Sequence, residues 1–150
     1  MLAKGKWGSE VELIDDTGGF GGGVIDSLLQ AGVSSVAVNF ASKADDSRYL
    51  NKRAEMWFRM AEWVKRGGCL PDIPELVREL TAPTYYFQNG RFQIEPKEQI
   101  KERLGASPDL ADALALTFAL PEAPSSSSLF TLPGAKPRFK ADYDPFATKD

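Results

Sequence analysis

The chain has 150 residues and a net charge of −3, with 43% hydrophobic and 26% charged residues, a balance typical of one soluble, globular domain. The charge provides no global basic field for nucleic acid, although local basic clusters could still bind it. One cysteine, Cys69, and no histidine exclude a disulfide framework, a zinc site built on these residues and any histidine-paired nucleophile. No signal peptide or membrane span is visible, and a reducing, cytoplasmic setting fits best.

The first part of the chain predicts a strand, a helix and a second strand in succession. An apolar run predicts a strand over residues 10–14, and the glycine-rich residues 17–23 follow as a loop. Helical spacing of apolar residues predicts a helix over residues 24–31, and β-forming residues predict a strand over residues 36–40. This succession is typical of a βαβ unit, so we expect the two strands to pair in parallel.

The middle of the chain predicts further helices and one β-hairpin. Helices are expected over residues 52–66, 73–80, 97–104 and 107–120. In the last of these, Ser107 is the expected N-cap and Pro108 lies in the first turn. Asn89-Gly90 between alternating apolar residues predicts a hairpin over residues 84–95.

The composition changes near Pro121, which sets the expected domain boundary. Residues 1–120 are predicted to form the domain, with residues 1–9 as a loose lead-in. Residues 121–150 are predicted to form a serine-rich flexible linker followed by an extended tail without periodicity.

Two adjacent aspartates, Asp15 and Asp16, follow the apolar part of the first predicted strand. The carboxyl end of a strand is where open α/β sheets place their ligands, so a metal site is one interpretation. A simple turn is the other, because aspartate, threonine and glycine are favoured in turns. Successive side chains on a strand point to opposite faces, so only one acid should face inward, and we favour Asp15.

The glycine loop predicts a tight turn that leaves room beside Asp15. It lacks the lysine-containing ending of a P-loop and the spacing of a dinucleotide fingerprint, so nucleotide binding is disfavoured. Basic residues on the predicted helices form two clusters, Lys52 with Arg53, and Lys97 with Lys101 and Arg103. Each cluster could hold phosphates or could simply be a solvated helix face.

A second acidic pair, Asp109 and Asp112, lies three residues apart on one face of the last predicted helix. An acid in the first turn of a helix is favoured by the helix dipole, which accounts for Asp109 without any site. Asp112 lies between two alanines before an apolar run, where a buried carboxylate is costly unless it is paired or binds a metal.

We therefore expect the two acidic pairs to meet and hold divalent metal. Asp15, Asp16, Asp109 and Asp112 are the candidate ligands, and oxygen ligands of this kind suit hard cations. Like charges held together repel, so at least one of these carboxylates should have a raised pKa without metal.

The series of motifs resembles the C-terminal nuclease domain of tailed-phage terminase large subunits. The resemblance is carried by residues 14–24, 38–40, 51–57 and 107–114, in this order, within residues 10–120. It implies an α/β, ribonuclease-H-like fold in which the β-hairpin is an insertion. It also implies that Asp15 matches the acid of the fourth strand and Asp109 the acid of the last helix, with Asp112 as a near neighbour.

The function that the resemblance implies is DNA packaging in a bacteriophage or prophage, inside the bacterial host cytoplasm. Such a hydrolase cuts concatemeric double-stranded DNA with two Mg²⁺ or Mn²⁺ ions, and Asp15, Asp109 and Asp112 would be the catalytic residues. The portal protein and the small terminase subunit are implied partners, and a membrane is not.

One departure from the family pattern bears on activity. The family fold opens with three antiparallel strands, the first of which carries another catalytic aspartate, and nothing before Glu10 matches them. The chain thus resembles an N-terminally truncated nuclease domain that lacks one metal ligand. The alternative to an active nuclease is a catalytically inactive module that binds DNA or a packaging partner.

Overall fold

The computed structural model describes residues 11–120. The chain divides into two units, residues 1–120 and residues 121–150, and the described residues all belong to the first. The predicted lead-in, linker and extended tail lie outside the described residues. The predicted absence of three opening strands also concerns residues outside this part and stays a prediction.

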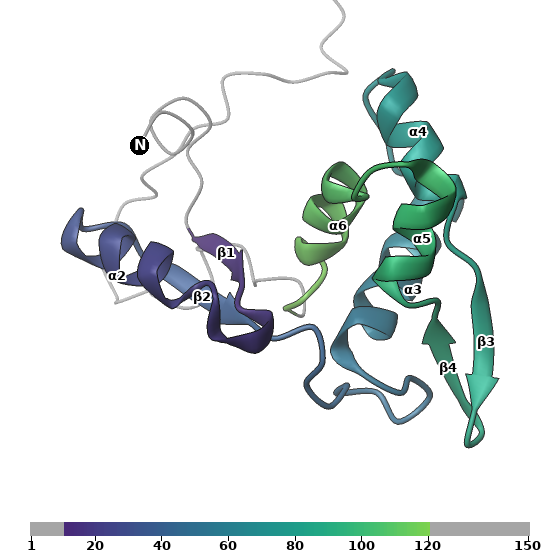
Figure 1. Ribbon diagram of the computed structural model, residues 1–150, viewed down its shortest axis with the longest axis horizontal. Coiled ribbons are helices and arrows are strands. Elements are labelled where there is room, and N and C mark those ends of the chain that lie inside the picture. The colour runs from purple at the N-terminus through teal and green to yellow at the C-terminus, as the bar shows by residue number, and fades with distance from the viewer. Residues whose placement is uncertain (1–10, 121–150) are drawn as a thin grey trace, which may run out of the picture. The chain divides into compact units, whose positions relative to one another are not determined.

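The first described elements form the βαβ unit that the sequence predicts. They are β1 (Glu12–Asp15), the short 3-10 turn η1 (Thr17–Gly19), α2 (Gly22–Gln30) and β2 (Ser35–Val38). Strands β1 and β2 pair in parallel, with Leu13 opposite Val36 and Asp15 opposite Val38. Because α2 connects these strands and packs on β2, the prediction of a parallel pair joined by a helix is confirmed (Figure 1).

Within the described residues, four helices follow β2. They are α3 (Lys52–Lys65), α4 (Pro74–Thr81), α5 (Lys97–Leu104) and α6 (Asp109–Leu116). Their positions agree with the predicted helices, although α6 ends before Leu120. From Thr117 onward the backbone N–H groups bond to carbonyls three residues back, beginning with Leu114 at 3.1 Å, so the end of the predicted helix tightens into turns.

The predicted capping role of Ser107 is wrong. Pro108 occupies the N-cap position of α6 and supplies no side-chain hydrogen bond. The Ser107 hydroxyl instead donates to the Asp109 carboxylate at 2.5 Å, so it is committed to a side chain and not to the helix backbone.

The predicted hairpin is present as β3 (Tyr85–Gln88) and β4 (Arg91–Ile94), paired antiparallel. At the turn, Asn89 has φ 52° and Gly90 has φ 74°, the left-handed conformation that a two-residue hairpin loop requires. Phe92 of β4 pairs on its other side with Tyr49. Among residues 11–120, the sheet that contains β3 has no further strand, so the outer edge of β3 is open.

Helix α6 is the element around which the core is built, since it packs against α3, α4 and β1 (Figure 1). The buried core combines Val38 and Phe40 from the end of β2, Met56, Trp57 and Met60 from α3, and Ala111 and Ala115 from α6. Leu13 of β1 packs against this cluster. None of the helices within residues 11–120 is long and apolar enough to span a membrane.

Candidate functional site

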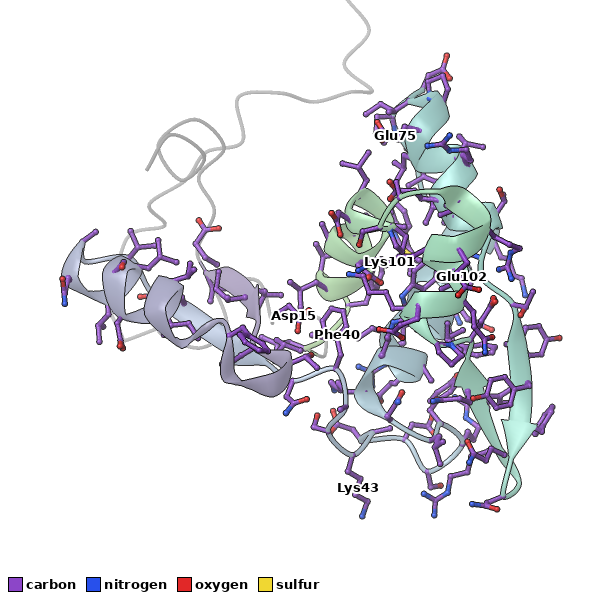
Figure 2. All side chains as sticks on the ribbon, in the orientation of Figure 1. Asp15, Phe40, Lys43, Glu75, Lys101 and Glu102 are labelled. Atoms are coloured by element: carbon purple, nitrogen blue, oxygen red, sulfur yellow. The ribbon has the colours of Figure 1, made fainter. Side chains whose placement is uncertain are left out.

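The carboxylate of Asp15 is held at the end of β1 by Thr17. Its Oδ1 accepts hydrogen bonds from the Thr17 amide at 2.9 Å and the Thr17 hydroxyl at 2.5 Å. The same hydroxyl accepts a hydrogen bond from the Phe40 amide at 3.1 Å, so it ties the acid to the end of β2. Among the described residues these bonds leave Oδ2 of Asp15 without a protein partner, and Figure 2 shows the side chain beside Phe40.

The carboxylate of Asp16 instead builds the turn. Its Oδ1 accepts a hydrogen bond at 2.8 Å from the amide of Gly21, which directly precedes α2. A Cβ at position 21 would lie 2.8 Å from the backbone oxygen of Asp15 and 3.1 Å from Asp16 Oδ1, so only glycine fits there. Local turn contacts therefore account for Oδ1 of both acids, since the bond from the Thr17 amide to Asp15 is an Asx turn. Among residues 11–120, Oδ2 of each acid has no protein partner.

The inward face of β1 is the face that α6 covers. Alternation along the strand puts Leu13 and Asp15 on the same face. Leu13 packs against the core cluster that contains Ala111 and Ala115 of α6, and α6 itself packs on β1. Asp15 consequently belongs to the sheet face on the α6 side.

The two acids of α6 share one lysine. Lys97 Nζ lies 2.9 Å from Asp112 Oδ2 and 3.5 Å from Asp109 Oδ1. The Asp109 side chain is 77% exposed, whereas that of Asp112 is 7% exposed. The contact with Asp112 lacks hydrogen-bond geometry, since Oδ2 has no hydrogen-bond partner, and we describe it as an ion pair.

Helix α3 supplies the remaining partners of Asp112. Trp57 Nε1 donates to Asp112 Oδ1 at 3.1 Å, and Arg53 Nη2 lies 3.7 Å from the same oxygen. Arg53 is itself held by Nη1, which donates to the Glu95 carbonyl at 2.7 Å. The buried carboxylate is therefore paired by protein groups, which is one of the two conditions under which its burial is tolerable.

The pKa values of the shared ion pair follow from these contacts. The Ser107 hydrogen bond and the charge of Lys97 hold the pKa of Asp109 below its ordinary value, against a smaller opposing effect of burial. Burial disfavours the charged form of Lys97, but the two carboxylates outweigh it and raise the lysine pKa. Asp109 is therefore not the carboxylate with the raised pKa that like-charge repulsion predicts, because the Ser107 hydrogen bond and the Lys97 charge both favour its charged form.

Sequence reasoning missed the roles of Lys97, Arg53 and Glu79. The two basic residues were interpreted as phosphate-binding groups or solvated helix faces, but both contact Asp112. Glu79 of α4 is buried and accepts a hydrogen bond from the Ala111 amide. Its only signal was helical spacing, since it lies three residues after Leu76 in the apolar stripe of α4.

The donor types fit a hard divalent cation, since every candidate ligand is a carboxylate. Within residues 11–120, however, no three acidic, histidine or cysteine side chains are gathered in a way that could hold a metal ion. Lys97 pairs with Asp109 and Asp112 at once, so a cation bound by both would have to displace it.

The fold of residues 11–120, with its parallel βαβ unit and the acidic helix α6 packed on β1, was compared with those of known proteins. No protein-family profile matches the sequence, and no curated protein matches it either. Solved structures do: the chain shares the mixed α/β, ribonuclease-H-like fold of terminase nuclease domains. This confirms the resemblance at the level of the fold.

Matching structures include several of the nuclease domain of the large terminase subunit gp2 of bacterial virus Sf6. That domain matches with a TM-score of 0.63 at 22% identity, covering 80% of this chain and 69% of its own. A point mutant solved with manganese has a TM-score of 0.66 at 22% identity, with 80% and 70% covered. The mutant solved with calcium has a TM-score of 0.66 at 22% identity, covering 80% of this chain and 69% of its own.

Proposed function

We propose that this chain is a metal-dependent endonuclease domain of a terminase large subunit, which cuts double-stranded, concatemeric phage DNA during packaging. The observation that carries the proposal is the fold shared with the Sf6 domain, a phage nuclease solved with divalent ions. The geometry adds that Asp15 belongs to the sheet face on the side of α6, the helix whose first turn bears Asp109 and Asp112.

In this proposal Asp15 and Asp109 hold divalent metal, Mg²⁺ or Mn²⁺, and Asp16 and Asp112 are neighbouring candidate ligands. A divalent cation, when bound, supplies Lewis acidity for phosphodiester hydrolysis. Thr17 orients the Asp15 carboxylate through two hydrogen bonds and leaves one oxygen free.

The groups around Asp112 hold its carboxylate in place and balance its charge. Trp57 fixes one oxygen of the Asp112 carboxylate, and the Arg53 guanidinium lies near the same oxygen. The first turn of α6, with Asp109 and Asp112, is called the acidic turn here. Lys97 neutralises part of its charge in the absence of metal and is the group that a divalent cation would replace.

A second candidate function is a catalytically inactive module that binds DNA or a packaging partner, such as the portal protein or the small terminase subunit. The observation that favours it is the ion pairing of Asp109 and Asp112 with Lys97, together with the lack of a three-ligand cluster within residues 11–120.

A Mn²⁺ titration separates the two candidates. Because a ligand that binds only the folded state stabilises it by mass action, Mn²⁺ at 100 times its dissociation constant should contribute about 2.7 kcal/mol and raise the melting temperature by several degrees. Asp15→Asn and Asp109→Asn should each abolish this gain, and both should abolish Mn²⁺-dependent nicking of supercoiled plasmid DNA.

The matched control is Asp72→Asn, at an exposed position outside the elements that carry the acids. It should retain the full Mn²⁺-dependent gain. A parent protein whose melting temperature does not respond to Mn²⁺ would contradict the nuclease proposal and support the inactive module.

A further inference from the structure

Glu79 caps α6 from a neighbouring helix. Its Oε2 accepts a hydrogen bond from the amide of Ala111 at 2.9 Å, and the residue is 3% exposed. The first N–H groups of any α-helix have no partner within the helix. Because the N-cap residue Pro108 provides no side-chain acceptor, a carboxylate from α4 satisfies one of these groups instead.

Burying the Glu79 carboxylate costs folding free energy that burying an apolar side chain at the same position would not. Within residues 11–120 no lysine or arginine pairs with Glu79, and its one hydrogen bond is to Ala111. A buried charge without a counter-charge is destabilising, and the positive end of a helix dipole offsets only part of that cost. The leucines around it, Leu76 and Leu80, show that apolar residues are accommodated on this stripe of α4.

The backbone group that Glu79 holds lies within the acidic turn. Ala111 directly precedes Asp112 and lies two residues after Asp109, and α4 packs directly on α6. From a second helix, Trp57 of α3 donates to the Asp112 carboxylate at 3.1 Å. The turn is therefore fixed twice, by its backbone from α4 and by its side chain from α3.

We propose that Glu79 is a positioning residue for the acidic turn of α6, one that sets where Asp109 and Asp112 present their oxygens to a divalent cation. This inference rests on the proposed metal-dependent function. It assigns Glu79 no contact with metal or DNA, and its effect passes through the Ala111 amide.

The experiment compares Glu79→Leu, Glu79→Gln and Glu79→Asp with the parent chain, using hydrogen exchange and Mn²⁺-dependent melting. Leucine removes the acceptor at similar volume, glutamine keeps an acceptor oxygen, and aspartate retracts the carboxylate by one methylene group. We expect Glu79→Leu to exchange the Ala111 amide at least tenfold faster and to need about tenfold more Mn²⁺ for half of the melting gain.

Glu79→Gln should stay within about twofold of the parent in both measurements, and Glu79→Asp should fall between the two, so the conclusion does not depend on the apolar variant folding well. Glu75→Leu, at the exposed first turn of the same helix (Figure 2), is the control and should match the parent. An unchanged Ala111 exchange rate or an unchanged Mn²⁺ midpoint in Glu79→Leu would overturn the inference.

The two proposals fail in different ways. A parent protein without any Mn²⁺-dependent gain contradicts the proposed function, and the exchange rate at Ala111 then decides the positioning role by itself. A parent that responds normally while Glu79→Leu responds equally well contradicts only the positioning role.

Discussion

At the scale of single residues, the ammonium group of Lys97 is the shared counter-charge of Asp109 and Asp112 in the first turn of α6. It lies within 3.5 Å of both Asp109 and Asp112, and it neutralises part of a repulsion that a divalent cation would otherwise relieve. In the proposed function, lysine and metal are alternative counter-charges for the same carboxylates, so removing Lys97 should strengthen the binding of metal.

Lys97→Ala tests this competition. Because the variant leaves the buried Asp112 without its ammonium partner, the metal-free protein should lose about 1–3 kcal/mol of unfolding free energy. Mn²⁺ should then raise the melting temperature by more than it does in the parent. Thermal melts with and without MnCl₂ measure both effects.

Lys43→Ala is the control for that measurement, since Lys43 lies exposed in the loop after β2 (Figure 2) and forms no ion pair among the described residues. It should leave both quantities near those of the parent. An equal Mn²⁺-dependent gain in Lys97→Ala and the parent would show that the lysine and the metal do not compete.

A second residue-scale prediction concerns pH. The Arg103 guanidinium, together with Thr84 and against the effect of burial, lowers the pKa of Glu95 from 4.5 to about 2. A lowered folded-state pKa stabilises the protein above pH 4.5, and this contribution is lost as the pH falls towards 2. Urea unfolding across this range should show the loss.

Glu95→Gln should flatten the dependence of unfolding free energy on pH in that range, because the glutamine does not titrate. Glu98→Gln, exposed on α5, should keep the slope of the parent. A slope in Glu95→Gln as steep as in the parent would mean that other carboxylates cause it.

At the scale of elements, local signals were sufficient where the chain folds on itself over a short distance. The βαβ unit and the hairpin at Asn89-Gly90 are each predicted by patterns within one continuous segment of the sequence, and both are present. The cap and the end of α6 were predicted less well. Glu79 of another helix took the capping role expected of Ser107, and no pattern within residues 107–120 contains that information.

Two glycines after β1, Gly21 and Gly23, differ in the space that is available for a side chain. Gly21→Ala would bring a Cβ to 2.8 Å from the Asp15 carbonyl oxygen, so it should destabilise the protein by about 1–3 kcal/mol. Gly23→Ala, within α2, meets nothing within 4 Å and should stabilise by about 0.4–1 kcal/mol.

Equilibrium unfolding in urea measures both changes, and each variant serves as the control for the other. Opposite signs are the expected result. A loss of stability in Gly23→Ala equal to that in Gly21→Ala would show that helix propensity and close contact are not what distinguishes the two positions.

At the scale of the whole molecule, the candidate site draws on segments that lie far apart in the chain. The rule that open α/β sheets place ligands at strand ends predicts Asp15 as a candidate, and helical spacing predicts Asp109 and Asp112. Their role as metal ligands stays a prediction. Lys97 and Trp57 were not assigned to the site, because the packing of α3, α5 and α6 brings them to Asp112. Their contacts are tertiary, and no local pattern specifies them.

The open edge of β3 has a consequence for how copies of this protein meet one another. Its residues, Tyr85 to Gln88, are all exposed and none is charged, whereas natural edge strands are commonly guarded by charge or proline. In a crowded solution this edge offers unpaired backbone groups to a second extended chain. The brevity of the strand is then its main protection against fibrous self-association.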